Sequence, residues 1–229
     1  MQLASEVYGR KCISLSSTGV SILQQPSSLL QTLASSYDLT YDRPWWYHDP
    51  DRKDYNRANL AALARLDSLG IEHNVTIPVW DMNQRYCEDL ASSLLPTRPD
   101  SILLLRLMPL GRNRQLITND QQIADQLIAS FRSHGYQGKV EKNCALARKC
   151  NGYSDTKLGL DQCGNIYWCI WAADLPVKKQ QNPFYLGNLL EEPLTEILDR
   201  NRQQAENIPR DRCYVLDYYH QKELEHHCR

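Results

Sequence analysis

The chain has 229 residues, a formal net charge of −1 and 42% hydrophobic residues. This composition is sufficient for a folded core and excludes an intrinsically disordered chain. Lysine and arginine form no long basic blocks, and no stretch approaches about 18 unbroken apolar residues, so we expect neither a nucleic-acid partner nor a membrane partner. The first residues lack a basic region followed by an apolar one, which predicts a cytoplasmic protein.

Short apolar runs alternate with amphipathic segments over the first 140 residues, and Thr18–Gly19 reads as a loop. The expected elements, in chain order, are a strand at Cys12–Ser16, a helix at Pro26–Ser36, a strand at Tyr37–Asp42, a helix at Tyr55–Gly70, a strand at Ile71–Trp80, a helix at Gln84–Leu95, a strand at Ser101–Pro109 and a helix at Asn119–Gly135. The strand at Ser101–Pro109 is apolar enough to be buried on both faces. Four strands that alternate with helices predict βα units and a parallel sheet.

After residue 140 the regular alternation stops and cysteines become frequent. "KLGLDQCGNIYWCIW" predicts a hairpin that turns near Cys163–Gly164. A late helix is expected at Asn188–Gln204, followed by a tail with the last two cysteines. The sequence therefore predicts two domains, residues 1–140 and residues 141–229.

Eight cysteines in a reducing compartment favour metal or redox chemistry over a disulfide framework. Their spacing is Cys144-x5-Cys150-x18-Cys169, and Cys213 follows 44 positions later. Thiolates from rigid short segments can converge on an iron–sulfur cluster. Scattered structural cysteines are the plain alternative, and a structural zinc site would usually show Cys-x2–4-Cys pairs, which this chain lacks.

A two-part motif lies in this cysteine-rich region. Cys150 is followed by thirteen residues, Gly164, four residues and Cys169, and the chain continues into Leu186–Asn188 and Leu194–Leu198. This pattern resembles the SPASM/twitch module of radical SAM enzymes, whose signature is a cysteine, a gap, Gly-x4-Cys and a Leu-Gly-Asn stretch.

The segments before the motif are also similar to radical SAM enzymes, so that the resemblance covers nearly the whole chain. The similar strands and loops are "ISLSSTG", "LTYD", "HDPDR", "NLAALARLDSLGI", "VTIPVWDMN" and "LLLRLMPLGRN". The resemblance implies an α/β fold. It consists of a partial parallel (β/α) barrel of about four βα units, followed by a small cysteine-rich, SPASM/twitch-like α+β module.

The resemblance implies that the cysteines hold one auxiliary [4Fe–4S] cluster. Cys144, Cys150 and Cys169 would supply three ligands, and the fourth would be Cys213, with Cys228 as the substitute. Cys163 lies at the expected hairpin turn and would not be a ligand. The Cys-x2-Cys-x5-Cys-x3-Cys run of full SPASM modules is absent, which implies the twitch-like form with one cluster.

Sites in parallel barrels lie at the carboxyl ends of the strands. By resemblance, Thr18, Asp42, Asn83 and Met108 would line the S-adenosylmethionine pocket, while ordinary turn chemistry or core packing is the alternative for each. The chain lacks the Cys-x3-Cys-x2-Cys motif, which holds the cluster that cleaves S-adenosylmethionine, and it has no Gly-Gly-Glu-Pro stretch. The resemblance begins near the third strand of the six-stranded partial barrel.

A parallel sheet that starts at this strand would expose an edge of unpaired backbone groups. Three explanations remain: another polypeptide supplies the front half of the barrel, the reading frame is truncated or a remnant, or the sheet is rearranged with a protected edge. The sequence predicts that this chain alone does not cleave S-adenosylmethionine, and its own enzymatic activity stays undecided.

Many SPASM members modify peptides, so the resemblance implies a peptide or protein substrate. In the sulfatase-maturing branch an aspartate follows the Gly-x4-Cys cysteine and serves as a base. This chain has Ile170 there, and we identify no catalytic residue. The rival hypothesis is a non-catalytic cysteine-rich module, with iron–sulfur or zinc, that holds a protein partner through the loop of Trp45 and Trp46.

Overall fold

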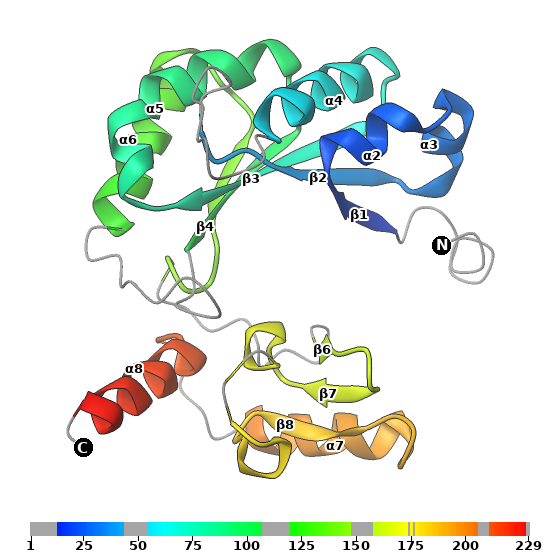
Figure 1. Ribbon diagram of the computed structural model, residues 1–229, viewed down its shortest axis with the longest axis vertical. Coiled ribbons are helices and arrows are strands. Elements are labelled where there is room, and N and C mark those ends of the chain that lie inside the picture. The colour runs from blue at the N-terminus through cyan, green and yellow to red at the C-terminus, as the bar shows by residue number, and fades with distance from the viewer. Residues whose placement is uncertain are drawn as a thin grey trace. The chain divides into compact units, whose positions relative to one another are not determined.

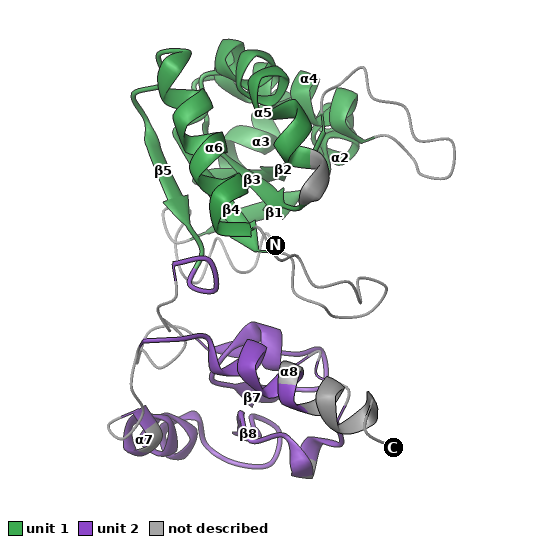
Figure 2. Cartoon of the chain, turned by 90° about the vertical axis from the view of Figure 1, so that its left-hand side faces the viewer, with its two compact units in different colours: residues 1–107, 117–143 green, residues 108–116, 144–229 purple. Residues whose placement is uncertain are grey.

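The computed structural model describes residues 13–43, 55–106, 120–147, 158–173, 175, 177–205 and 211–227. The chain divides into two compact units (Figure 2). Unit 1 contains residues 1–107 and 117–143, and unit 2 contains residues 108–116 and 144–229. Every helix within the described ranges is too short or too polar to cross a membrane.

Unit 1 is built from strands and helices that alternate along the chain (Figure 1). In order, its elements are β1 (Ser14–Ser17), α2 (Gly19–Gln24), α3 (Ser27–Leu33), β2 (Ser36–Thr40), α4 (Asn56–Ser68), β3 (Glu72–Val79), α5 (Asp81–Leu94), a 3-10 turn η2 (Leu95–Thr97), β4 (Ser101–Arg106), α6 (Asp120–Ser133) and β5 (Lys139–Lys142). Residues 107–109 of the strand expected at Ser101–Pro109 lie outside the described ranges.

The described strands of unit 1 form one sheet in the order β1-β2-β3-β4-β5, and all neighbours are parallel. The parallel α/β sheet is thus confirmed, but the expected count of four strands is wrong. The fifth strand, β5, has the sequence Lys-Val-Glu-Lys, which has no apolar run to reveal it. Backbone pairing with β4 holds it in the sheet, and it spans residue 140, where the sequence placed the domain boundary.

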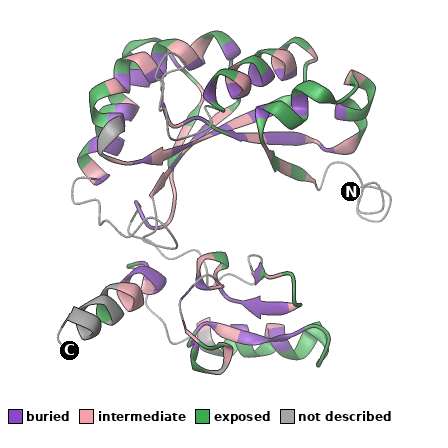
Figure 3. Cartoon of the chain, viewed as in Figure 1, coloured by how far each residue is buried: buried purple, intermediate pink, exposed green. Residues whose placement is uncertain are grey.

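The described helices of unit 1 lie along one face of this sheet (Figures 1 and 3). The core between the helices and the sheet consists of aliphatic and aromatic side chains with no exposed surface: Leu39, Tyr41, Leu63, Leu66, Val75, Ile77, Val79, Leu90, Leu94, Ile102, Leu104, Leu127 and Phe131. Burial of this layer is the main driving force for folding of the unit. We call the opposite side of the sheet the open face.

The short helix α2 corrects the prediction that the chain makes only a loop at Thr18–Gly19. Gly19 begins α2 and packs directly on α4, because a Cβ at Gly19 would lie 2.3 Å from the Ala58 carbonyl oxygen. The Arg65 guanidinium on α4 donates to the carbonyl oxygens of Ile22 and Leu23, both at 2.9 Å. Arg65 thereby satisfies the last carbonyls of α2, which a helix six residues long cannot satisfy within itself.

Unit 2 consists of short strands, turns and two helices in its described part. Its elements are β6 (Gly159–Leu160), β7 (Asn165–Tyr167), the 3-10 turns η3 (Ile170–Ala172) and η4 (Lys179–Gln181), β8 (Tyr185–Asn188), α7 (Leu194–Ala205) and α8 (Tyr214–His227). The described strands form an antiparallel sheet in the order β6-β7-β8. The hairpin predicted near Cys163–Gly164 is confirmed: it joins β6 to β7.

The helix predicted at Asn188–Gln204 is wrong in its first part. Asn188 ends β8, and α7 begins at Leu194, directly after Pro193. The Asn188 side chain accepts the Leu190 N–H at 2.7 Å, which favours a turn over a helix at this point. The C-terminal tail, to which the sequence assigned no element, forms α8.

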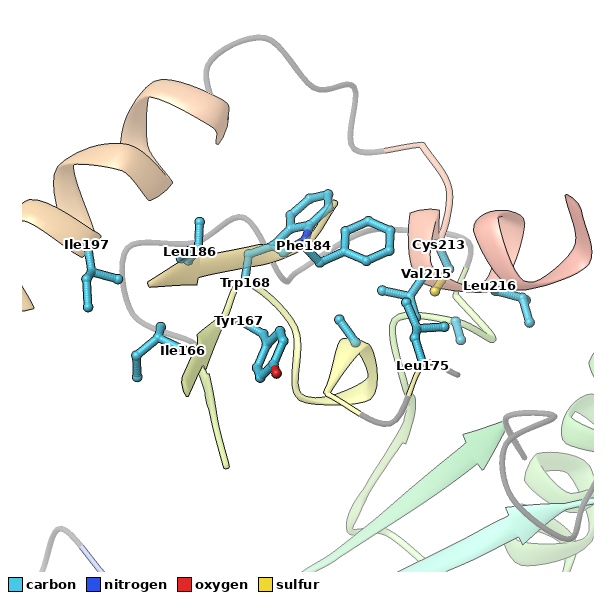
Figure 4. Close-up of a cluster of buried hydrophobic side chains, with 12 residues drawn as sticks. Ile166, Tyr167, Trp168, Leu175, Phe184, Leu186, Ile197, Cys213, Val215 and Leu216 are labelled. Carbon is cyan, nitrogen blue, oxygen red and sulfur yellow. The ribbon is translucent and has the colours of Figure 1, made fainter. Parts of the chain in front are cut away.

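The core of unit 2 is a cluster of twelve buried side chains (Figure 4). Its members are Ala145, Ile166, Tyr167, Trp168, Ala172, Leu175, Phe184, Leu186, Ile197, Cys213, Val215 and Leu216. They come from the segment after β5, from β7, η3, β8, α7 and the start of α8. Because the strands are short, contacts between turns and helix ends hold this core together.

Candidate functional site

Three of the four residues predicted to line a cofactor pocket lie in the described part of unit 1, and all three follow the carboxyl ends of strands. Thr18 follows β1, Asp42 follows β2, and Asn83 lies in the first turn of α5 after β3. Met108, the fourth, lies outside the described residues. The structure therefore places the described candidates at the edge of the sheet where parallel α/β folds carry their sites.

Asn83 joins two of these strand ends. Its side-chain oxygen accepts the Trp80 N–H at 3.0 Å, and its side-chain nitrogen donates to the Asp42 carbonyl oxygen at 2.8 Å. Asn83 has no exposed surface. Both ends of its amide thus bind backbone groups of this chain, which gives Asn83 a structural role at this edge.

Asp42 and Thr18 are more accessible than Asn83. The Asp42 carboxylate accepts the Asn56 side-chain N–H at 2.9 Å and lies 3.6 Å from the Arg43 Nε. The Arg43 guanidinium lies over the Trp80 ring, 5.4 Å from its centroid. Thr18 is exposed, and its hydroxyl lies 3.2 Å from the Ser21 hydroxyl. Of the predicted residues, Asp42 and Thr18 present polar atoms at the surface of this edge.

Sequence reasoning missed Asn59, which organises the same edge from α4. Its side-chain oxygen accepts the Gly19 N–H at 2.6 Å, and its side-chain nitrogen donates to the Thr40 carbonyl oxygen at 2.6 Å. The signal was available: Asn59 lies three and seven residues before Ala62 and Leu66, on the buried stripe of the helix. A polar residue on such a stripe indicates a buried hydrogen-bonding role.

The open face of the sheet is polar, which the sequence analysis also missed. One register row crosses the described strands of unit 1 and places Ser16, Asp38, Asn74, Ser101 and Lys139 side by side. A parallel sheet covered on both faces would have apolar residues in such a row.

The apolar part of the open face lies on β4. Leu103 and Leu105 are only partly buried there. Within the described residues, the prediction that this strand is buried on both faces is therefore wrong, because the described helices of unit 1 pack against its other face.

Hydrogen bonds on the open face link neighbouring strands. The Ser14 hydroxyl donates to Asp38 Oδ2 at 2.9 Å, and the Ser36 hydroxyl donates to the Ser14 hydroxyl at 2.9 Å. On the other side of the row, the Ser101 hydroxyl donates to Asn74 Oδ1 at 2.6 Å. These bonds leave further acceptor capacity on the Asp38 carboxylate and donor capacity on the Asn74 amide. The face can therefore hydrogen-bond a polar molecule.

In unit 2, the two halves of the sequence motif pair with each other. Asn165, which follows Gly164, is opposite Asn188, and Ile166 is opposite Gly187. The Asn188 side-chain nitrogen donates to Asn165 Oδ1 at 2.8 Å and to the Cys163 carbonyl oxygen at 3.1 Å. The two halves of the motif therefore form the paired strands β7 and β8. Cys169 lies two residues after the end of β7.

The cysteines after residue 140 fall into different environments. Cys144 and Cys169 are partly buried, Cys213 is buried, and Cys163 is exposed at the hairpin turn. Cys150 and Cys228 lie outside the described residues. Cys213 belongs to the core cluster, Cys169 packs against it, and Ala145 beside Cys144 is also a member. The segments of three predicted ligands thus enter one core.

The donor chemistry of these segments suits an iron–sulfur cluster, because thiolates are its usual protein ligands. Within the described residues, however, no group of three or more His, Cys, Asp and Glu side chains could hold a metal ion. Cys144, Cys169 and Cys213 thus do not form a ligand group in the described structure, and Cys150 lies outside the described ranges.

Ring contacts join the segments of Cys169 and Cys213. Trp168 immediately precedes Cys169, and Tyr214 immediately follows Cys213. Their ring centroids lie 6.2 Å apart, and Trp168 also packs on Phe184 at 4.8 Å (Figure 4). Contacts of this kind stabilise the approach of the two cysteine segments.

Cys87 shows what a structural cysteine looks like in this chain. It is buried on α5, and its thiol donates to the Asn83 carbonyl oxygen at 3.0 Å. Burial, with a smaller contribution from Glu88, raises the pKa of the Cys87 thiol to about 11. The thiol therefore stays protonated at neutral pH, which makes it a poor ligand and a poor nucleophile.

No protein-family model matches the sequence, and no curated protein is similar to it. Among solved structures, the fold is similar to that of hexahistidine-tagged anSMEcpe with bound AdoMet, with a TM-score of 0.59 and 13% sequence identity. The similarity covers 89% of this chain and 59% of that one, so the chain spans little more than half the length of anSMEcpe. At this identity the likeness establishes a shared fold.

A second solved structure is a glycosyl hydrolase 25 of Streptococcus pneumoniae, named GHIP and described as a virulence factor that participates in host cell invasion. Its TM-score is 0.39 and its identity is 12%, over 56% of this chain and 58% of that one. A similarity this low carries no argument about the fold or the site.

Proposed function

We propose that this chain is the C-terminal part of a radical SAM/SPASM-type protein and binds one auxiliary [4Fe–4S] cluster in unit 2. Cys144, Cys150, Cys169 and Cys213 supply the ligands. When bound, such a cluster supplies an electron-transfer centre. The protein serves in the modification of a peptide or protein, and this chain alone does not cleave S-adenosylmethionine.

The observation that carries the proposal is the convergence of cysteine segments in one core. Ala145, which follows Cys144, and Cys213 belong to the core cluster of unit 2, and Cys169 packs against the same cluster, although these residues are far apart in sequence. The fold similarity to anSMEcpe with bound AdoMet supports the radical SAM assignment, because it spans both units rather than the parallel sheet alone: it covers 89% of the chain.

The ring contact between Trp168 and Tyr214 supports Cys213 as the fourth ligand, and the alternative, Cys228, lies outside the described residues. Trp168 precedes Cys169 and Tyr214 follows Cys213, and the centroids of their rings lie 6.2 Å apart. Cys163 is excluded as a ligand in this proposal. It is exposed, and its N–H donates to Asp161 Oδ1 at 2.8 Å in the hairpin turn.

We further propose that a polypeptide with additional βα units joins unit 1 beside β1. In the described residues β1 is the edge of the sheet, and its outward positions Ser14 and Ser16 are exposed. The adjacent helices α2 and α3 expose Val20, Leu23 and Leu29 by 39–40%. Apolar side chains beside a strand edge suit a further helix and a further parallel strand.

The open face is where we place the peptide or protein substrate. Asp38, Asn74 and Ser101 offer acceptors and donors in one row across the sheet, and a peptide backbone carries both kinds of group. Asp42 and Thr18, at the carboxyl edge of the same sheet, are proposed to contact S-adenosylmethionine, with Asn83 positioning the strand ends and Met108 completing the set.

Anaerobic reconstitution with iron and sulfide tests the cluster. The wild-type chain should bind about four irons and absorb broadly near ~400 nm. Cys169→Ala and Cys150→Ala should lose the iron, whereas Cys163→Ala, the matched control in the hairpin, should keep it. Stoichiometric zinc with no uptake of iron contradicts the proposal.

Cleavage of S-adenosylmethionine tests the division of roles. The chain lacks the Cys-x3-Cys-x2-Cys site, whose three ligands leave one iron open to S-adenosylmethionine. Reduced with dithionite, the reconstituted chain should therefore form no 5′-deoxyadenosine above a cluster-free control. Product formation by the isolated chain would show that Cys144, Cys150 and Cys169 hold an open cluster instead.

The second candidate is a non-catalytic module that holds a protein partner, and the loop of Trp45 and Trp46 expected to contact that partner lies outside the described residues. A separate observation in unit 2 favours this candidate. Unit 2 exposes Leu190 by 83%, and Leu160 and Ile170 each by 53%. Exposed aliphatic side chains mark a protein-binding surface where they form a contiguous patch, and this candidate proposes that they do so here. Uptake of zinc alone, combined with loss of partner binding in Leu190→Ser, supports this candidate over the cluster protein.

A further inference from the structure

His73 is a buried histidine with a carbonyl oxygen at each ring nitrogen. It lies in β3 and is 2% exposed, and its Nδ1 lies 2.9 Å from the Ile71 carbonyl oxygen. Its Nε2 lies 2.7 Å from the carbonyl oxygen of Thr97, the last residue of the turn η2. Both distances are those of good hydrogen bonds. The ring therefore connects η2 to the start of β3.

A neutral imidazole cannot satisfy both contacts. It carries one N–H donor and one lone pair, and only the charged imidazolium has a donor at each nitrogen. In a neutral His73, one nitrogen lone pair would lie within 2.9 Å of a carbonyl oxygen, and the two acceptors would repel each other. Thr97 is 3% exposed, so water has little access to separate them. The geometry therefore favours hydrogens on both ring nitrogens.

A buried charge needs a partner, because burial by itself disfavours the charged form. Asp100 supplies this partner: its Oδ2 lies 3.8 Å from His73 Nδ1 and accepts the His73 N–H at 2.8 Å. The Asp100 N–H donates to the His73 carbonyl oxygen at 2.9 Å, which fixes the position of the carboxylate beside the ring. The Asp100 side chain is 54% exposed, so it keeps contact with water.

Other charged and titratable groups in this region make contacts of their own. Arg98 pairs with Asp67, with Nη2 2.6 Å from Oδ2. The hydroxyl of Tyr37, on the neighbouring strand β2, donates to a backbone carbonyl oxygen at 2.9 Å, and that of Tyr136 does so at 3.0 Å. None of these contacts involves the imidazole ring, so Asp100 is the counter-charge that its contacts identify.

We propose that His73 forms a pH-sensitive link in unit 1: as an imidazolium it donates to both carbonyl oxygens and holds η2 against β3, and loss of one hydrogen releases one of these contacts. The link lies at the amino end of β3, whereas the candidate site lies at the carboxyl ends of the strands. It requires neither a metal cluster nor S-adenosylmethionine and is therefore independent of the proposed function.

The sign of the pH dependence follows from proton linkage. An exposed histidine loses its second ring hydrogen near pH ~6.5, so the unfolded chain releases this hydrogen before the folded chain does. Above that pH the folded unit holds one more proton than the unfolded chain, and its stability falls as the pH rises. The equilibrium constant for unfolding should therefore rise by up to about 10-fold per pH unit until the folded ring also becomes neutral.

The test compares the full-length wild type with His73→Gln, which keeps an amide donor but cannot carry the charge. His134→Gln is the matched control, because His134 is an exposed histidine directly after α6. NMR of the ring nitrogens counts the N–H groups of His73 at neutral pH. Urea unfolding, followed through NMR signals of unit 1, is measured between about pH 6.5 and 8.5, below the ordinary thiol pKa of 9.0.

The wild type should show two ring N–H groups on His73 at neutral pH, and its unfolding constant should rise with pH as derived above. His134→Gln should keep this rise, and His73→Gln should lose it. If His73→Gln does not fold, Asp100→Asn decides: removal of the counter-charge should make the second ring N–H disappear at a lower pH than in the wild type.

Two results overturn the inference. A single ring N–H on His73 at neutral pH, with an unfolding constant that does not change with pH, would show that the ring is neutral and that one carbonyl contact lacks a donor. An equal rise in the wild type and in His73→Gln would assign the pH dependence to another group.

Discussion

Unit 1 buries aliphatic side chains between a parallel sheet and helices, whereas unit 2 joins short antiparallel strands to turns through a small core of mixed aliphatic and aromatic side chains. In unit 1, every described strand pairs along four to six residues with its neighbour. In unit 2, β6 and β7 pair over only two residues. Among the described residues, backbone pairing between strands is therefore more extensive in unit 1 than in unit 2.

The two units therefore obtain their stability from different sources. A layer of leucine, isoleucine and valine with no exposed surface can hold unit 1 together without a cofactor. Unit 2 has a small core with two predicted cysteine ligands, Cys213 within it and Cys169 packed against it, and a metal bound there would contribute directly to folding. We therefore expect the two units to respond differently to metal.

The largest effect should follow from removal of iron. Structural metals in small domains contribute on the order of 10 kcal/mol, which is comparable to the whole stability of many domains. In the apo chain, the amides of residues 144–229 should lose protection from hydrogen exchange, while those of unit 1 should keep it. Exchange followed by mass spectrometry on apo and reconstituted protein measures this. Equal protection in both forms would remove the distinction between the two units.

A matched pair of core truncations should give the next largest effect. Leu66 in unit 1 and Ile197 in unit 2 are both fully buried, and truncation of either to alanine should cost about 2–5 kcal/mol. Leu66→Ala should lower the free energy of unfolding of unit 1 and leave the iron content unchanged. Ile197→Ala should destabilise unit 2 and accelerate iron loss. Iron loss from Leu66→Ala would instead show that retention of iron in unit 2 depends on the stability of unit 1.

The sequence predicts unit 1 well because its signals are local. The stripe of Leu63 and Leu66 on α4 and the alternation in β3 repeat with the periods of helix and strand. The errors occur where tertiary contacts decide. β5 carries too few apolar residues to be recognised, and α2 depends on the contact of Gly19 with α4 and on the bonds from Arg65.

The candidate site was predictable only in part, since its geometry depends on residues distant in sequence. The placement of Asp42 and Asn83 after strands follows from the βα pattern, but the polar row of Asp38 and Asn74 required knowledge of the register. In unit 2, the hairpin at Gly164 followed from the sequence. The pairing of Asn165 with Asn188 did not, because it joins segments separated by 23 positions.

One glycine in each unit allows the stability of the two units to be compared at a single position. Gly19→Ala would place a Cβ 2.3 Å from the Ala58 carbonyl oxygen and should destabilise unit 1 by about 1–3 kcal/mol. Gly164 has a φ of +80°, so Gly164→Ala should destabilise unit 2 by roughly 1–2 kcal/mol.

Denaturant unfolding with hydrogen exchange assigns each loss to its unit. Val20→Ala, beside Gly19 but 39% exposed, is the control and should have little effect. A stable Gly19→Ala variant would show that α2 can move away from α4 without cost.

The smallest expected effect concerns the charge of Asp161 in the hairpin of unit 2. Burial alone would raise the pKa of the Asp161 carboxyl, but hydrogen bonds from Asn165, Cys163 and Tyr167 outweigh it and hold the pKa below the ordinary 3.8. A lowered folded-state pKa means that the carboxylate stabilises the hairpin above its unfolded pKa. This stabilisation is lost as the pH falls through the folded pKa.

Titration by NMR should therefore give Asp161 a midpoint below about 3.8, with coupled shifts of the Cys163 and Asn165 amides, which donate to its Oδ1 at 2.8 and 3.0 Å. Asp161→Asn keeps an acceptor in the turn but removes the charge, so the coupled shifts should vanish while the hairpin persists at neutral pH. A midpoint at or above the ordinary aspartate value would mean that these hydrogen bonds do not favour the charged form. In that case the pairing of β7 with β8, rather than the Asp161 charge, holds the turn before Cys169.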